Sequence, residues 1–212
     1  MSILTTNLRA LAVLGSLSAL PLVADGPSLN VGGAVIKQLD SARTITNYTN
    51  GFSVSGAADW AVGSGYTVRT GLALNVLPGR TMVAPGRSDN GVKTTLDGLQ
   101  LFSDIHIPTG TQGLNLVVGL SVQQWQYKTS KPAASVSPIG ADSASGTIKG
   151  PKLGGRIGLD WRFNAKWSAE FMIQQTELGN KDSSEVRGDA SVSPFLTNEN
   201  PGWYQLGLRY HF

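Results

Sequence analysis

Apolar and polar residues alternate along most of the chain after residue 26, with a period of two rather than 3.6. The clearest stretch is 153–163. One of its faces carries Leu153, Gly155, Ile157, Leu159, Trp161 and Phe163, and the other carries Gly154, Arg156, Gly158, Asp160 and Arg162. A period of two is typical of a β-strand that has one apolar and one polar face.

The same alternation recurs often enough to predict eight strands. They span about 28–37, 52–62, 66–76, 99–107, 114–123, 153–163, 167–174 and 204–212. The first is the least regular, because Gly32 and Gly33 interrupt the alternation. An even number of strands suits an antiparallel sheet that closes on itself.

The connections between these strands alternate strictly between short and long. The short ones, 63–65, 108–113 and 164–165, have the length of hairpin turns. The long ones, 38–51, 77–96, 129–151 and 179–202, are rich in Ser, Gly, Asn, Asp and Pro. In an up-and-down barrel this order places all short turns at one end and all long loops at the other.

The charges on the polar faces indicate which side of the barrel is inside. These faces carry Asp59, Arg69, Asp104, Arg156, Asp160, Arg162, Glu170 and Arg209, four basic and four acidic residues, whereas the middle of the apolar faces carries none. A narrow lumen requires such a balance, because an unpaired buried charge is costly. Asp59 and Arg69 stand opposite each other across the first short turn. Balanced charges also occur on ordinary water-facing surfaces. The charges alone therefore do not exclude the alternative of a soluble ligand-binding barrel.

Aromatic residues favour the membrane arrangement. They gather on the apolar faces beside the short turns and at the C-terminus: Trp60, Tyr66, Trp161, Phe163, Trp167, Tyr210 and Phe212. Aromatic residues banded at one height of an outward face form a membrane-interface girdle. A second, less regular girdle is expected at the other end from Phe52 and Tyr204, with Trp125, Tyr127 and Trp203 nearby. We therefore predict an all-β fold, an eight-stranded antiparallel up-and-down transmembrane β-barrel.

The N-terminus predicts export. A single charge, Arg9, precedes the apolar stretch 10–23, and the composition changes abruptly after Ala24. This is the pattern of a signal peptide, and the stretch is too short and interrupted for a transmembrane helix. We expect residues 1–24 to be a signal peptide and residues 25–212 to form the barrel.

Composition excludes several other classes. The chain has no Cys and two His among 212 residues, which argues against disulfides, a Cys nucleophile and a metal site. We expect no cofactor. The net charge of +3 is weak and scattered, so nucleic acid is not an expected partner.

The last eight residues resemble the assembly signal of bacterial outer-membrane proteins. That pattern sets a polar residue, a Gly, an aromatic residue and a terminal aromatic residue at fixed spacing, and here Gln205, Gly207, Tyr210 and Phe212 match it. With the export signal and the strand count, the chain resembles the small eight-stranded outer-membrane barrels, such as the OmpA transmembrane domain and OmpX. The resemblance implies an outer-membrane location, extracellular long loops, periplasmic termini, contact with lipid and lipopolysaccharide, and handling by the barrel assembly machinery.

The expected function is a structural or surface-interaction role, of the adhesin or binding type. Large lumen residues, among them Gln100, Phe102, Met172 and Gln174, fill the interior beside the charges. The long loops would carry binding, and their Lys and Arg residues could meet lipopolysaccharide phosphates or an extracellular ligand. The alternative is a narrow, low-conductance channel, because Gly71, Ala73, Gly119, Ser121, Gly154 and Gly158 leave room. We do not expect the protein to be an enzyme. His106 and His211 lie on the polar face at the end of the short turns, away from any serine in the long loops.

Overall fold

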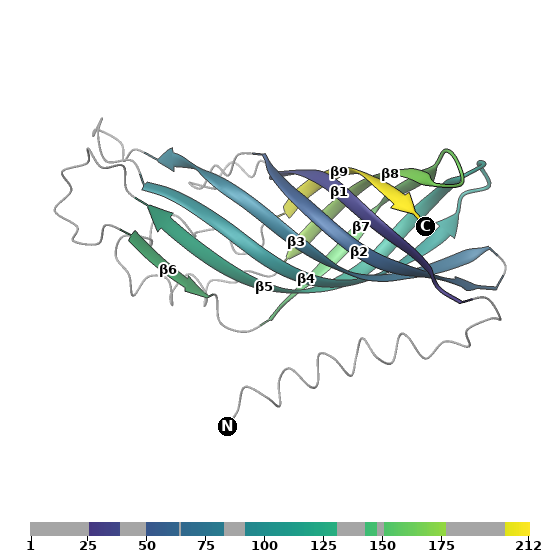
Figure 1. Ribbon diagram of the computed structural model, residues 1–212, viewed down its shortest axis with the longest axis horizontal. Helices are drawn as coiled ribbons and strands as arrows, with labels where there is room; N and C mark the ends of the chain where they lie inside the picture. The colour runs from purple at the N-terminus through teal and green to yellow at the C-terminus, as the bar shows by residue number, and fades with distance from the viewer. Residues whose placement is uncertain are drawn as a thin grey trace, which may run out of the picture.

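The computed structural model describes residues 26–38, 50–63, 65–82, 92–130, 143–147, 151–176 and 202–212, and the predicted signal segment 1–24 lies outside them. Nine strands make up the described part (Figure 1): β1 (Ser28–Gln38), β2 (Gly51–Val62), β3 (Tyr66–Met82), β4 (Val92–Pro108), β5 (Leu114–Ser130), β6 (Ser143–Thr147), β7 (Lys152–Arg162), β8 (Trp167–Thr176) and β9 (Gly202–His211). None of the described residues belongs to a helix long and apolar enough to cross a bilayer.

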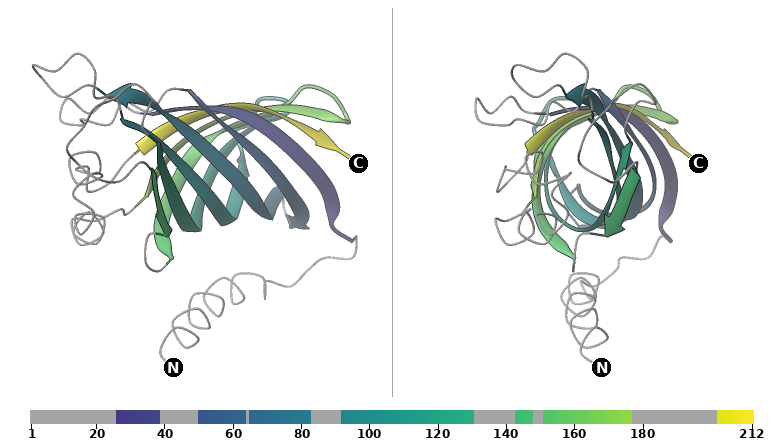
Figure 2. Two further views of the ribbon diagram at one scale, coloured as in Figure 1. Left: turned by 60° about the vertical axis from the view of Figure 1, so that its left-hand side comes forward. Right: turned by 90° about the vertical axis from the view of Figure 1, so that its left-hand side faces the viewer.

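Eight of the strands close into a ring. Their hydrogen-bonded order is β4-β3-β2-β1-β9-β8-β7-β5, and an additional pairing of β4 with β5 completes the circuit. Each neighbouring pair is antiparallel. The right panel of Figure 2 looks along this ring. The predicted eight-stranded antiparallel up-and-down barrel is therefore confirmed.

The ninth strand, β6, corrects one expectation. The segment 129–151 was expected to be loop throughout, but Ser143–Thr147 pairs with the end of β5. It follows the same edge of β5 that β7 occupies nearer the short turns. Its sequence, SASGT, has no apolar alternation, so only pairing with the extended β5 edge makes it a strand.

Strands β3, β4 and β5 are longer than the alternation predicted, with 17 residues each. Their ladders continue to the pairs Met82–Val92 and Lys93–Ser130, and in Figure 1 the three strands extend further from the C-terminus than β1, β2 and β9 do. In this extension the outward positions are polar, as at Asp97 and Gln126. Backbone pairing continues there although the hydrophobic signal has ended, and the loop bounds 77–96 and 129–151 were therefore too wide.

The barrel is apolar outside and polar inside. Outward residues such as Leu72 and Leu120 are 55% and 56% exposed, whereas inward residues such as Gln100 and Gln123 are fully buried. A water-soluble barrel would bury the apolar side chains instead. An exposed apolar band around a closed ring is the surface that lipid covers, which settles the choice between the two architectures in favour of the transmembrane barrel.

Three short turns gather at the end of the barrel where the C-terminus also lies, called here the turn end (Figure 1). Gly63 and Gly65, and likewise Gly110 and Gly113, have positive φ angles that L side chains rarely adopt. In the third turn the Asn164 side chain accepts hydrogen bonds from the backbone N–H groups of Lys166 and Trp167. The opposite end is called the far end.

The strands are strongly staggered. Register partners lead around the ring from Ser28 through Asp59, Arg69, Asp104, Gly119, Arg156, Gln174 and Trp203 back to β1 at Gln38. One circuit thus advances ten residues along β1. Such stagger accompanies a strand tilt of roughly 35–45°. Residues that meet across the lumen are consequently remote from one another in the ladder.

Candidate functional site

The lumen is layered from one end to the other, and β9 shows every layer. Its inward side chains run from the far end to the turn end in the order Trp203, Gln205, Gly207, Arg209 and His211. In strand β4 the part of this order that lies nearer the turn end is repeated by Gln100, Phe102, Asp104 and His106. The lumen therefore changes from apolar to amide, then to charged, then to imidazole.

Arg69 is the centre of the charged layer. Its Nε and Nη2 donate to the two carboxylate oxygens of Asp59 at 2.7 and 3.1 Å. Nη2 also donates to Asp160 at 3.3 Å, and Nη1 donates to Glu170 at 3.0 Å. Asp59 and Arg69 are register partners, as their spacing around the first turn predicted. One guanidinium thus joins carboxylates from β2, β7 and β8.

Two further arginines extend the network around Glu170. Arg209 Nε donates to Glu170 at 3.3 Å, and its Nη1 and Nη2 donate to Asn30 and Ser55 at 2.7 and 3.2 Å. Arg156 lies 3.8 Å from Glu170. Glu170 is therefore paired with three guanidiniums, which offsets the cost of its burial.

Arg156 also closes the side of the lumen next to β4. Its Nε lies 3.2 Å from Asp104 Oδ1, and its Cζ lies 4.3 Å from the ring centroid of Phe102. A planar guanidinium can pair with a carboxylate and stack on a ring at the same time. Arg156 therefore connects the charged layer to Phe102, which lies next to that layer on the side of the far end.

Arg162 is placed differently from the other seven predicted lumen charges. It shares their face of β7, but its side chain is exposed at the turn end and donates to the backbone carbonyl of Ala165 at 2.7 Å. The prediction that Arg162 joins the lumen network is wrong, because β7 ends at this residue and leaves its side chain at the mouth. Alternation fixes the face of a strand but not how far along the barrel axis a residue lies.

Both histidines lie at the turn end of the network. His106 Nδ1 is 3.2 Å from Asp160 Oδ2, and His211 Nδ1 is 3.7 Å from Asp59 Oδ2. His211 Nε2 lies 3.1 Å from the hydroxyl of Ser168. Ser168 was missed by sequence reasoning, although the alternation of β8 already put it on the polar face.

The imidazole layer offers no ready catalytic or metal site. The sequence Ser168, His211, Asp59 has the order of a catalytic triad, but Ser168 is fully buried and Asp59 is held bidentately by Arg69. A nucleophile needs access to a substrate. Among the described residues no group of three or more His, Asp or Glu side chains is arranged to hold a metal ion.

An amide layer lies on the far side of the charges. Asn75 Nδ2 donates to Gln100 Oε1 at 2.8 Å, and Gln100 Nε2 donates to Gln174 Oε1 at 3.0 Å. This chain of amides crosses the lumen from β3 through β4 to β8. Gln123 adds a bond of 2.9 Å to Thr176. The layer is polar but carries no charge.

The far end of the lumen is filled by indoles, which corrects the expected second girdle. Trp125 and Trp203 are 0% and 2% exposed, point inward, and meet edge to face with ring centroids 5.4 Å apart. Ile36 and Leu77 are buried in the same part of the lumen. The strand phase decides this, since Trp125 shares its face with Gln123 and Trp203 shares its face with Gln205. Phe52 and Tyr204 do lie outside, at 53% and 38% exposure, and the side chain of Tyr127 lies outside the described residues.

Glycines receive the large lumen side chains. A Cβ on Gly71 would meet the Phe102 ring, one on Gly158 would meet Met172, and one on Gly98 would meet the Trp125 ring. Each of these pairs consists of register partners. The space beside the glycines that the sequence analysis expected to be free is therefore occupied by the side chain of the register partner. This is why the expected room for a channel does not lie beside Gly71, Gly119, Gly154 and Gly158.

The open space lies instead beside β1, β2 and β9. A cavity of about 20 Å³ is bounded there by small residues, including Gly32, Ala34, Ser53, Ser55 and Gly207. Larger side chains complete the lining: Gln205 and Arg209 from β9, Gln100 and Phe102 from β4, and Arg156 from β7. This cavity lies between the charged layer and the apolar layer of the lumen.

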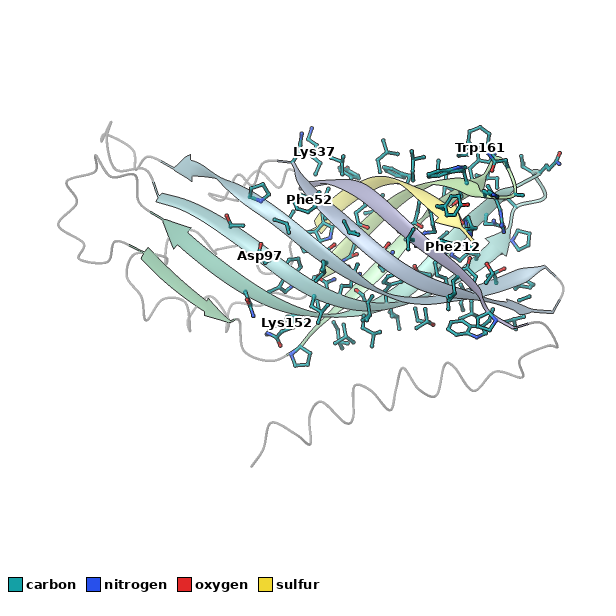
Figure 3. The ribbon with its side chains drawn as sticks, viewed as in Figure 1. Lys37, Phe52, Asp97, Lys152, Trp161 and Phe212 are labelled. Carbon is teal, nitrogen blue, oxygen red and sulfur yellow. The ribbon has the colours of Figure 1, made fainter. Side chains whose placement is uncertain are left out.

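The predicted interface aromatics gather near the turn end. Trp161 and Phe212 are labelled there in Figure 3, whereas Asp97 and Lys152 lie nearer the far end. Trp167 packs on Tyr210 with centroids 5.1 Å apart, and Tyr210 packs on Phe212 at 5.2 Å. The other members are exposed or half-buried on the outer face: Trp60, Tyr66, Trp161 and Phe163. Their role at a membrane interface stays a prediction.

The four residues of the predicted assembly signal occupy both faces of β9. Gln205 and Gly207 line the lumen cavity, whereas Tyr210 and Phe212 belong to the outer aromatic cluster. The backbone N–H of Phe212 donates to Leu29 at 3.0 Å, which joins the end of β9 to the start of β1. The predicted signal therefore lies on β9, the strand whose pairing with β1 closes the barrel.

No protein-family model matches the chain, and no curated protein matches it. Among solved structures it is similar to Neisserial surface protein A (NspA), at 13% identity over 89% of this chain and 98% of that chain, with a TM-score of 0.50. Ail, the attachment invasion locus protein of Yersinia pestis in complex with the heparin analogue sucrose octasulfate, gives the same identity and TM-score over 89% and 100%. The N-terminal β-barrel domain of Pseudomonas aeruginosa OprF follows at 13% identity, 89% and 100% coverage and a TM-score of 0.47. The resemblance to the small outer-membrane barrels is confirmed as one of fold.

Proposed function

We propose that this protein is an integral outer-membrane barrel with a closed lumen, which serves as a rigid scaffold for a structural or surface-interaction role. The observation that carries the proposal is the double filling of the lumen. The Arg69 network occupies the turn end, and the indoles of Trp125 and Trp203 occupy the far end. A lumen filled in this way is unsuited to solute flux, so the surface and the long connections are left to carry function.

The remaining parts of the proposal follow from the fold and the sequence pattern. Residues 1–24 serve as the signal peptide, the turn end and the termini face the periplasm, and the long connections face outward. Gln205, Gly207, Tyr210 and Phe212 direct the chain to the barrel assembly machinery. Ail was crystallised with a sulfated ligand, which supports this fold as a scaffold for ligand binding at the cell surface.

Conductance of the refolded mature chain, residues 25–212, in a planar bilayer tests the closed lumen. We expect no steps above the bare bilayer while the protein is folded and inserted. A steady small conductance in the wild-type protein would instead support the narrow channel, for which the polar cavity beside Arg156 and Arg209 is the favourable observation. Surface labelling of intact cells at the long connections tests the orientation.

A further inference from the structure

The cavity in the middle of the lumen is suited to water. Its volume of about 20 Å³ exceeds the roughly 10–15 Å³ that one water molecule needs in this measure. Its lining offers hydroxyl, amide and guanidinium groups from Ser53, Ser55, Gln100, Gln205 and Arg209. A water molecule is retained in a buried site when it finds two to four polar partners, and this lining supplies them.

Some buried polar atoms around the cavity make no hydrogen bond within the protein. Gln174 Nε2 and Asn75 Oδ1 in the amide layer are two of them, and Arg156 Nε, on a residue that lines the cavity, is ion-paired with Asp104 but makes no hydrogen bond. Such an atom destabilises the fold if it is left unsatisfied, because burial has removed the water that it would otherwise bind. Bridging water is the usual solution in a polar site of this size.

The two boundaries of this region differ in chemistry. Toward the turn end lies the ionic layer, in which Arg69, Arg209 and Glu170 are joined by bonds of 3.0 and 3.3 Å. Toward the far end lies the apolar layer, in which Trp125 and Trp203 meet across the lumen. We propose that the middle of the lumen is a hydrated chamber with two seals in series, an ionic seal at the turn end and an indole seal at the far end.

Seals in series make a specific prediction for variants. Opening one seal connects the chamber to one side of the membrane, so a small solute can enter but cannot cross. Opening both seals joins the two sides, so ions can cross. Entry into the chamber and conduction across the barrel are therefore separable, which a lumen closed by a single constriction would not allow.

Entry is measured with a cysteine placed in the chamber wall. The chain contains no Cys, so Ser53→Cys, at a cavity-lining position that is 6% exposed, gives one thiol. The reagent is methyl methanethiosulfonate, which adds a single S-methyl group that intact mass detects. We expect no labelling of Ser53→Cys in the otherwise wild-type folded barrel. We expect complete labelling when either Trp125→Ala or Arg69→Ala is added.

Matched variants control this experiment. Trp161→Ala removes an outward indole and Arg162→Ala removes an exposed guanidinium, so neither opens a seal and Ser53→Cys stays unlabelled in both. Thr109→Cys in an exposed turn reports active reagent in every background. Folding is checked by the altered gel mobility that an intact barrel shows before heating. If Trp125→Ala fails to fold, Trp203→Leu opens the same seal from β9.

Conduction is measured with the same proteins in planar bilayers. We expect Arg69→Ala and Trp125→Ala to be silent singly and to conduct in combination. Labelling of Ser53→Cys in the wild-type background would overturn the sealed chamber. Conduction by a single variant, or silence of a folded double variant, would overturn the series arrangement. Conduction by the wild-type barrel would refute the proposed closed function itself, so the two failures are distinguishable.

Discussion

Replacing Arg69 by Met tests whether the lumen is held by its ion pairs. The side chain is 2% exposed and contacts three carboxylates. Glu170 keeps Arg209 and Arg156 after the change, and Asp160 keeps His106 at 3.2 Å. Asp59 and Asp160 both lose their only guanidinium, but Asp160 keeps the closer imidazole, whereas the remaining neighbour of Asp59 is His211 at 3.7 Å.

The expected magnitude follows from this count. Removing one partner of a buried ion pair costs about 3–5 kcal/mol, because the other charge stays buried without compensation. Asp59 is the carboxylate left with the most distant partner, so we expect the free energy of unfolding to fall by about 3–5 kcal/mol. Adding Asp59→Asn removes this charge, and the double variant should recover about 1–3 kcal/mol of that loss.

Urea unfolding of the barrel in lipid vesicles, followed by tryptophan fluorescence, measures these free energies. Arg162→Met is the matched control, since its side chain is exposed and donates to the carbonyl of Ala165 rather than to a carboxylate, and it should change stability by about 0.5 kcal/mol or less. The reasoning is refuted if Arg69→Met loses no more than this control. It is also refuted if Asp59→Asn adds to the loss rather than reducing it.

Three further changes test other parts of the structure. Gly98→Leu should destabilise the barrel by about 1–3 kcal/mol in the same unfolding assay, because a Cβ there would lie 2.5 Å from the facing indole. Gly155→Ala, where nothing lies within 4 Å of the added Cβ, should not. Val118→Arg, at the middle of the apolar face of β5, should cost about 2–4 kcal/mol and Gln126→Arg beyond that face about 0–1 kcal/mol, and equal losses would contradict the placement of the lipid band. Phe212→Ala should lower the yield in the outer-membrane fraction of cells while refolding in detergent is unchanged, and an unaltered yield would exclude the assembly role.

The alternation of apolar and polar residues predicted those features that depend only on a single strand and on its neighbour in the hairpin. It gave the face of nearly every strand residue and the pairing of Asp59 with Arg69, because side-chain direction has a period of two and a short turn fixes the register. It also predicted the closed antiparallel order from the connection lengths. These features are local, and so a single sequence is sufficient to reveal them.

The contacts across the lumen could not be predicted in the same way. The bond from Arg69 to Glu170 joins residues 101 positions apart, and it depends on a stagger of ten residues per circuit that no local pattern encodes. Trp125 was expected near an outer girdle because the predicted strand ended at Gln123. The alternation in fact continues past that residue and turns Trp125 inward. Arg162 was expected inside because the alternation shows which face a residue is on but not how far along the barrel axis it lies. The missing quantity in each case is position along the barrel axis.

The buried charges also determine the register of the sheet. A slip of one residue between β2 and β3 would send every side chain of one strand to the opposite face, so Arg69 would enter lipid and Thr70 would enter the lumen. An arginine at the bilayer midplane costs about 2–4 kcal/mol in a barrel, and Asp59 would lose its partner as well. Apolar residues alone discriminate weakly here, because Val117, Phe102 and Met172 are accommodated inside. The charged layer therefore acts first as a specification of strand pairing, and the closed lumen follows from it.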